Sequence, residues 1–129
     1  MREIYLRPFE AAVKEGGSLG AMSSFNYIGT TWAGGNSALL KDLLRGEWGF
    51  EGLVITDANL YGFMNPIQMV YNGGNLSLDV MAMYMGGAGH GSQIQAVAED
   101  PTTRIGAAQS VFQSAKDILF AVSRTWAVE

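Results

Sequence analysis

The chain contains the segment Gly49-Phe50-Glu51-Gly52-Leu53-Val54-Ile55-Thr56-Asp57. Its three consecutive aliphatic residues, preceded by glycine and followed by a carboxylate, are typical of a short parallel strand covered on both faces. In an α/β barrel, the residues just beyond the carboxyl end of a strand face the mouth of the active site. Asp57 stands at that position and is the first candidate for a catalytic residue.

Helical and strand patterns alternate on both sides of this segment. Leucines at helical spacing predict a helix that Asn36 or Ser37 caps and that Gly46 ends. The remaining expected elements are a helix over 3–15 with Ile4, Phe9, Ala12 and Val13 facing inward, a strand over 19–24, a loop over 27–35, a helix over 66–71 and a strand over 76–80. Helices that alternate with strands predict an α/β fold with three or four parallel strands. The chain has no internal repeat and no linker, so we expect a single domain over 1–129.

The last third of the chain contains the clearest helical pattern and the least regular segment. Asp100 and Pro101 suit the start of a helix. Apolar residues then recur at helical spacing, at Ile105, Ala108, Phe112, Ala115, Leu119, Val122 and Trp126. Residues 81–92, rich in methionine and glycine, have no helical or strand period, and we expect no regular element there.

Four motifs follow one another in order: Tyr5-Leu6-Arg7-Pro8-Phe9, Ala21-Met22-Ser23-Ser24-Phe25-Asn26, Leu43-Leu44-Arg45-Gly46-Glu47-Trp48-Gly49-Phe50 and Gly52-Leu53-Val54-Ile55-Thr56-Asp57. Together they resemble glycoside hydrolase family three, the family of β-glucosidases and β-xylosidases. The resemblance is strong over residues 1–80 and fair over 100–127. It implies the C-terminal half of a (β/α)8 barrel, with Asp57 at the position of the nucleophile of a retaining mechanism. The family's Lys-His pair and the carboxylate of its second domain have no counterpart in this chain.

The length of the chain limits what it can form alone. A complete eight-stranded barrel needs about 250 residues, and this chain has 129. A half-barrel has unpaired sheet edges and an uncovered interior. We therefore expect two copies to complete one another as a homodimer.

Composition narrows the classes of partner. The net charge of −4 and the lack of a basic stripe argue against nucleic acid. No apolar run reaches the roughly 18 residues of a membrane span. With one histidine and no cysteine, a metal site is not expected, nor is a cofactor. The absence of cysteine and of a signal-like start favours a cytoplasmic protein.

A retaining glycosidase needs a second carboxyl group about 5–5.5 Å from its nucleophile. Asp79, near the end of the next strand, either lines the pocket or is structural. His90, set among glycines, is either an exposed loop residue or a general acid/base on a mobile loop, because histidine titrates near neutral pH. The remaining substrate-binding candidates are Ser24, Asn26, Trp32 and Tyr61.

Three functions remain open at this point. The first is a hydrolase in which Asp57 attacks substrates with good leaving groups. The second is a non-catalytic remnant that binds carbohydrate or only folds and dimerises. The third is an esterase or phosphotriesterase whose site, at a dimer cleft, combines Asp57 and His90.

Overall fold

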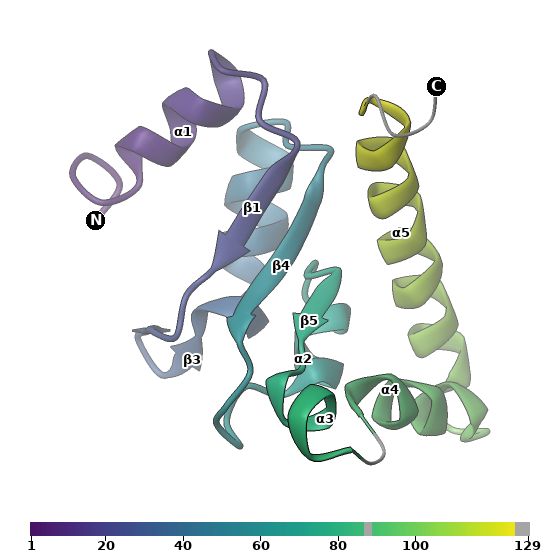
Figure 1. Ribbon diagram of the computed structural model, residues 1–129. Helices are drawn as coiled ribbons and strands as arrows, with labels where there is room; N and C mark the ends of the chain where they lie inside the picture. Colours follow the sequence, from purple (N-terminus) through teal and green to yellow (C-terminus); the bar gives the residue numbers. More distant parts are fainter. Residues whose placement is uncertain (87–88, 126–129) are drawn as a thin grey trace.

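The structure of the protein, a computed structural model, describes residues 1–86 and 89–125. Its centre is a parallel sheet in the order β1 (Gly20–Ser23), β4 (Leu53–Ala58) and β5 (Leu76–Leu78). The helices η2 (Ala38–Glu47) and α2 (Pro66–Tyr71) lie behind this sheet in Figure 1. The expected α/β class with three parallel strands is therefore confirmed.

The other elements surround this sheet. The N-terminal helix α1 (Arg7–Lys14) lies at the β1 edge, whereas α5 (Arg104–Ser123) stands beyond β5 (Figure 1). A small antiparallel hairpin, β2 (Tyr27–Ile28) and β3 (Thr31–Trp32), continues into the 3-10 turn η1 (Ala33–Gly35). The remaining helices are α3 (Val80–Met85) and α4 (His90–Glu99).

Two glycines bring β4 into the sheet. Gly49 has φ +74°, a conformation that side chains disfavour. A Cβ atom on Gly52 would lie 2.1 Å from the carbonyl oxygen of Leu19, so only glycine lets the two strands approach at this point. Within β4, Val54 and Thr56 are buried against the helices. The intervening residues, including Asp57, point to the other face.

The helix η2 is a π-helix, in which Trp48 N–H donates to the Leu43 carbonyl. Asn36 caps its start by accepting from Leu39 N–H at 3.1 Å, as expected. Its leucines form the main core with Trp48, Phe50 and Val54. A second core surrounds Trp32, Met64, Met69 and Val70.

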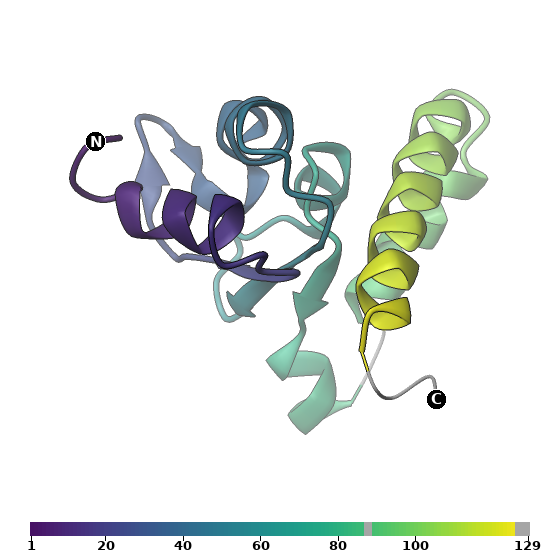
Figure 2. The ribbon, with the colours of Figure 1, turned by 90° about the horizontal axis from the view of Figure 1, so that it is seen from above.

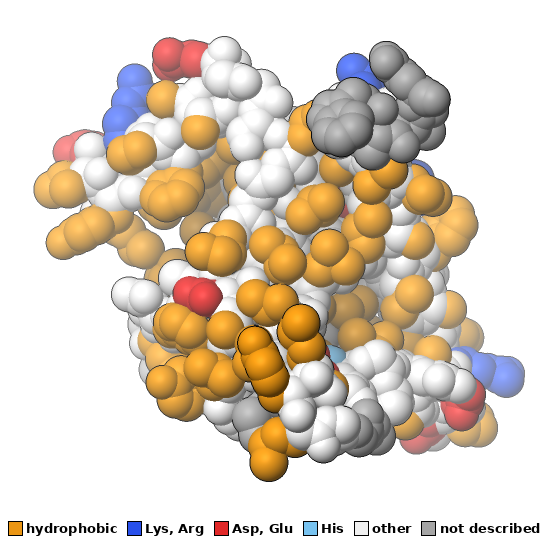
Figure 3. Space-filling model, viewed as in Figure 1, with side chains coloured by type: hydrophobic (Ala, Val, Ile, Leu, Met, Phe, Trp, Pro, Cys, Tyr) orange, Lys and Arg blue, Asp and Glu red, His pale blue; other side chains and the backbone are white. Residues whose placement is uncertain are grey.

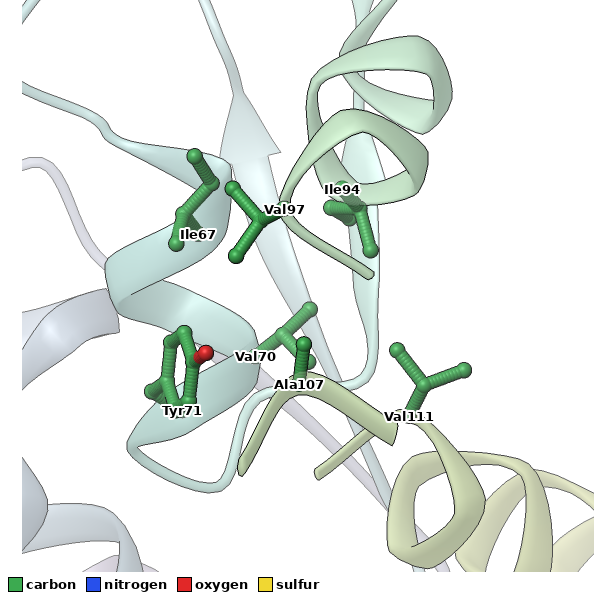
Figure 4. A pocket seen from close by; sticks show the side chains of 7 residues that line it. All are labelled: Ile67, Val70, Tyr71, Ile94, Val97, Ala107 and Val111. Atoms are coloured by element: carbon green, nitrogen blue, oxygen red, sulfur yellow. The ribbon is translucent and has the colours of Figure 1, made fainter. Parts of the chain in front are cut away.

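Apolar side chains join α2, α4 and α5. Ile67, Val97 and Ala107, among others, point toward one another from these three helices (Figure 4). The space left between them is about 10 Å³, which is about one water molecule. This region is a packed joint between helices and is too small for a ligand.

A buried polar network holds the amino ends of the strands. Asp117 on α5 lies 3.2 Å from Arg45, which also donates to the Asn75 side chain at 2.9 Å. Asn75 in turn donates to Asp117 at 3.0 Å and accepts from Val54 N–H. Burial lowers the pKa of Arg45, and the charge of Asp117 opposes that shift. The network fixes which side of α5 faces the sheet.

Two expectations for the helices were wrong. The first helix begins at Arg7, and both Ile4 and Phe9 are exposed. Only Leu6 and Val13 pack against the core there, because α1 lies at an edge of the sheet. The final helix begins at Arg104 rather than at Pro101, because Asp100 accepts from Thr102 N–H in a turn that precedes it. Trp126, the last residue of its apolar pattern, lies outside the described residues.

Residues 81–92 also differ from expectation, since they contain most of α3 and the start of α4. The cause is Asp79, whose carboxylate accepts from Ala82 N–H at 3.1 Å and from His90 N–H at 2.7 Å. One side chain therefore caps α3 and binds the first residue of α4. A helix cap formed by a side chain of another segment leaves no hydrophobic period in the sequence, so the sequence pattern did not predict these helices.

The face of the sheet opposite η2 and α2 is not covered by any element that the structure describes (Figures 1 and 2). Hydrophobic side chains gather there over the strands and α3 (Figure 3). They include Met22, Leu76, Leu78 and Met83, all exposed. The open face of a half-barrel was expected, but its completion by a second copy stays a prediction.

Candidate active site

Asp57 is the penultimate residue of β4, at the carboxyl end of the sheet. It is half-buried, and its Oδ1 accepts from Ala58 N–H at 2.7 Å. In the described part of the chain, Oδ2 has no hydrogen-bond partner. One oxygen is therefore held in place while the other remains available on the open face.

The loop after β1 reaches the same edge. Ser23 pairs with Thr56, and extending this register places Ser24 level with Asp57. The Ser24 carbonyl accepts from the Trp32 indole at 2.8 Å, and the Asn26 carbonyl accepts from Ala33 N–H at 2.9 Å. The exposed side chains of Ser24 and Asn26 remain candidates for binding substrate.

Trp32 does not offer a surface for a sugar in the described structure. Its ring is only 2% exposed and belongs to the second core. Its indole N–H donates to the Ser24 carbonyl at 2.8 Å. Trp32 positions the loop.

Four other aromatic rings form an exposed cluster beside this edge. Tyr61 and Phe63 follow β4, stacked with an interplanar angle of 5° and centroids 5.5 Å apart. Phe25 and Tyr27 follow β1 and contact them edge-on and tilted, with centroids 5.8 and 5.1 Å apart. We call these four residues the aromatic cluster. Tyr61 was a sequence candidate, whereas Phe25 was missed although an aromatic residue just past a strand could have indicated it.

A chain of polar side chains fixes the loops after β4 and β5. Asn59 donates to the Met64 carbonyl at 2.7 Å and to Ser77 Oγ at 3.3 Å. Ser77 Oγ shares a hydrogen bond of 2.8 Å with His90 Nδ1, which lies 3.5 Å from Asp79. The sequence analysis did not identify Asn59 or Ser77. Asn59 could have been found from its position two residues beyond Asp57, whereas no signal marks Ser77.

His90 and Asp79 act on each other rather than on the open edge. His90 is the first residue of α4 and is half-buried, so the expectation of a loop residue was wrong. The hydrogen bond from His90 N–H is the main cause that lowers the pKa of Asp79, followed in the same direction by that from Ala82 N–H and the charge of His90, with burial opposing. Both Asp79 oxygens accept backbone hydrogen bonds. Of the two roles considered for Asp79, lining the pocket or supporting the structure, this arrangement favours the second.

Three other acidic side chains are also engaged. Glu47 pairs with Arg2 at 2.8 Å, and Glu99 accepts from Gln95 at 2.7 Å on its own helix. Asp100 accepts from Thr102 in the turn before α5. Among the described residues, no hydrogen bond or ion pair joins the Asp57 carboxylate to a second acidic side chain or to His90.

The described residues contain no cluster of three histidine or acidic side chains that could hold a metal ion. Among the same residues, no helix has both the length and the apolar character to cross a membrane.

The model of the glycosyl hydrolase family 3 N-terminal domain matches residues 1–114. This match spans most of the chain, which therefore belongs to glycoside hydrolase family 3. The segment that contains Asp57 lies inside it.

Curated proteins and solved structures agree with this assignment. The chain is 53% identical over 57 residues to β-glucosidase B of Emericella nidulans, covering 44% of this chain and 7% of that one. It is 42% identical over 81 residues to a putative β-xylosidase of Formosa agariphila, covering 60% and 11%. The structure of β-glucosidase 3B from Thermotoga neapolitana in complex with α-D-glucose matches with a TM-score of 0.80 and 28% identity, over 94% of this chain and 16% of that chain. The chain thus spans a small part of the relatives it matches.

Proposed function

We propose that this chain carries the nucleophile of a retaining β-glycosidase and that Asp57 is this nucleophile. The observation that supports this most is the position of Asp57. It is the penultimate residue of β4, within the segment that the family model matches. Its Oδ1 is held by Ala58 N–H, and its Oδ2 is unbonded among the described residues and so free to attack. Such a carboxylate forms a covalent glycosyl-enzyme that water then hydrolyses.

The proposed substrates are β-glucosides or β-xylosides with good leaving groups. A missing general acid typically costs 10²–10⁴-fold in rate, and the carboxylates of Asp79, Glu99 and Asp100 are engaged in other hydrogen bonds. Aryl glycosides need little protonation of the leaving oxygen, so they avoid this cost. Alkyl glycosides are expected to react when a longer polypeptide or a second copy covers the open sheet face and supplies the acid.

The test is a covalent trap. The chain is incubated with a 2-fluoro aryl β-glucoside, which forms a long-lived glycosyl-enzyme, and its intact mass is measured. An adduct is expected on wild type and on Asp42→Asn, an exposed acidic residue of η2. Asp57→Asn should give none. An equal adduct on Asp57→Asn would overturn the assignment of the nucleophile.

The aromatic cluster favours a second candidate, carbohydrate binding without turnover. Exposed aromatic rings stack on the apolar faces of sugars, and these four stand beside the edge that holds Asp57. Binding of an aryl β-glucoside by calorimetry, lost in Tyr61→Ala but kept in Asp57→Asn, is the result expected if the cluster binds the ligand. Saturable binding with no adduct and no turnover would replace the first candidate by this one.

The esterase or phosphotriesterase alternative has less support. It needs His90 to act on substrate together with Asp57, whereas the imidazole is bonded to Ser77 and lies beside Asp79. If His90→Ala lost ester hydrolysis while the fold was kept, this alternative would be favoured.

A further inference from the structure

One face of α5 carries apolar side chains that nothing in the described structure covers. Ile105, Phe112 and Leu119 are 70%, 69% and 68% exposed. Ala108, Ala115 and Val122 are exposed between them. These six residues, which we call the α5 seam, alternate in steps of three and four. That spacing is the a/d pattern by which one helix packs against another.

The rotational orientation of α5 about its own axis is fixed, so the α5 seam cannot face the core. The opposite side of the helix carries Asp117, which is bonded to Asn75 and paired with Arg45 at the amino ends of the strands. Ser114 and Ala107 are buried on that same side. The polar side of this helix therefore faces its own sheet, and the apolar seam faces away from it.

We propose that the α5 seam pairs with the same seam of a second copy of this chain, in antiparallel orientation about a two-fold axis. An antiparallel pair with its axis between Phe112 and Ala115 matches a large residue with a smaller one in every layer. The layers are Phe112 with Ala115, Ala108 with Leu119, and Ile105 with Val122 of the second copy. Facing positions that alternate large and small fill a helix interface evenly.

A parallel pair fits worse. It would place like residues opposite one another, so that layers of two phenylalanines or two leucines alternate with layers of two alanines. Such a seam is uneven along its length, and the bulky layers would hold the alanine layers apart.

The flanking residues are compatible with the antiparallel pair. In this register Lys116 faces Gln109, and Val111 faces Ile118 of the second copy, which widens the apolar strip on one side. Arg104 faces Thr125. No like charges face one another, and interfaces between identical copies are most often closed by such a two-fold axis. This pairing uses the outer side of α5, so it is independent of whatever covers the open sheet face and of the proposed glycosidase activity.

Disulfide trapping tests the surface and its orientation together. The chain has no cysteine, so single cysteines can be placed without background. Mixing Ala108→Cys with Leu119→Cys should give a cross-linked dimer under mild oxidation. Ala108→Cys alone should not, because the two Ala108 positions of an antiparallel pair lie roughly 16 Å apart along the axis and a disulfide needs Cα atoms within about 7 Å.

Sedimentation velocity gives the second readout. Phe112→Glu should raise the dimer dissociation constant by about 10²-fold or more, since both copies lose a buried ring. Tyr84→Glu, 80% exposed on α3, is the matched control and should leave association unchanged. Circular dichroism checks that each variant is folded.

Two results would overturn the proposal. One is a wild-type chain that stays monomeric at about 100 μM, a concentration at which contacts of micromolar affinity are saturated. The other is a dimer that Met22→Glu, on the open sheet face, dissociates while Phe112→Glu does not. Cross-linking of Ala108→Cys with itself would overturn the antiparallel orientation in favour of a parallel pair.

Discussion

The two ends of the three-stranded sheet use their polar side chains differently. At the amino end, Asn75 and Asp117 are buried, Arg45 is half-buried, and the three side chains are bonded to one another. At the carboxyl end, Asp57 has one oxygen bonded only to the next residue and stands beside exposed aromatic rings. We infer that the amino end stabilises the fold, and we propose that the carboxyl end, where Asp57 stands, serves binding and chemistry. Mutations at the two ends should therefore differ in their effect on the free energy of unfolding.

The largest loss of stability is expected from Asp117→Ala. The change leaves the Arg45 guanidinium without its carboxylate in a site where the Asp117 side chain is only 9% exposed. Removing one partner of a buried ion pair costs about 3–5 kcal/mol. Urea unfolding measures this, with Asp42→Ala as the exposed control. A loss below about 1 kcal/mol, the size expected of an exposed pair, would show that the network does not stabilise the amino end.

Two buried asparagines allow a direct comparison of the ends. Asn75→Ala removes hydrogen bonds to Val54, Arg45 and Asp117, whereas Asn59→Ala removes those to Met64 and Ser77. Each buried group left unsatisfied costs about 1–3 kcal/mol, so we expect the loss at Asn75 to exceed that at Asn59 by about 1 kcal/mol or more. Equal losses by urea unfolding would mean that both ends are equally structural.

The parts of the fold that the sequence predicted are those fixed by local patterns. The helix over Pro66–Tyr71 was predicted at both ends, because Pro66 and the Asn72-Gly73-Gly74 run mark them. The strand that leads to Asp57, and the parallel strands beside it, were predicted from apolar runs between glycines. The family resemblance supplied the role proposed for Asp57, which position alone did not give.

The parts that the sequence did not predict depend on contacts between distant segments. His90 lies at a helix start because its backbone N–H bonds to Asp79, eleven residues earlier. Trp32 is buried because it packs against Met64, Met69 and Val70, while its indole N–H donates to the Ser24 carbonyl. The α5 seam is exposed because the opposite side of the helix, which carries Asp117, faces the sheet. The hydrophobic spacing of the helix does not reveal that a buried ion pair lies on its other side.

A smaller effect is expected from Asp79→Asn, and it should depend on pH. The pKa of Asp79 is lowered in the folded protein from its ordinary 3.8, chiefly by the hydrogen bond from His90 N–H. Its charge therefore stabilises the fold above that value, and the contribution is lost as the pH falls through the lower folded pKa. Near neutral pH, the free energy of unfolding of wild type should exceed that of Asp79→Asn by about 1 kcal/mol, as expected for a charged helix cap.

The control for this pH dependence is Asp42→Asn, at an exposed residue of η2, measured over the same pH range. The advantage of wild type over Asp79→Asn should shrink steadily once the pH falls below the ordinary pKa of 3.8. An advantage that grew on acidification would contradict the sign of the pKa shift.

The smallest effect on stability is expected from Asp57→Asn, and it tests the comparison at its other extreme. Asparagine keeps the size of the side chain and an oxygen that can accept from Ala58 N–H, so the free energy of unfolding should change by less than about 0.5 kcal/mol. The same variant should lose the covalent adduct with the 2-fluoro glycoside. A loss of about 2 kcal/mol or more, typical of a structural site, would assign Asp57 to the structure of the strand end. Unchanged stability with a lost adduct would place it among residues kept for chemistry, since a carboxylate that does not stabilise the fold is free to react.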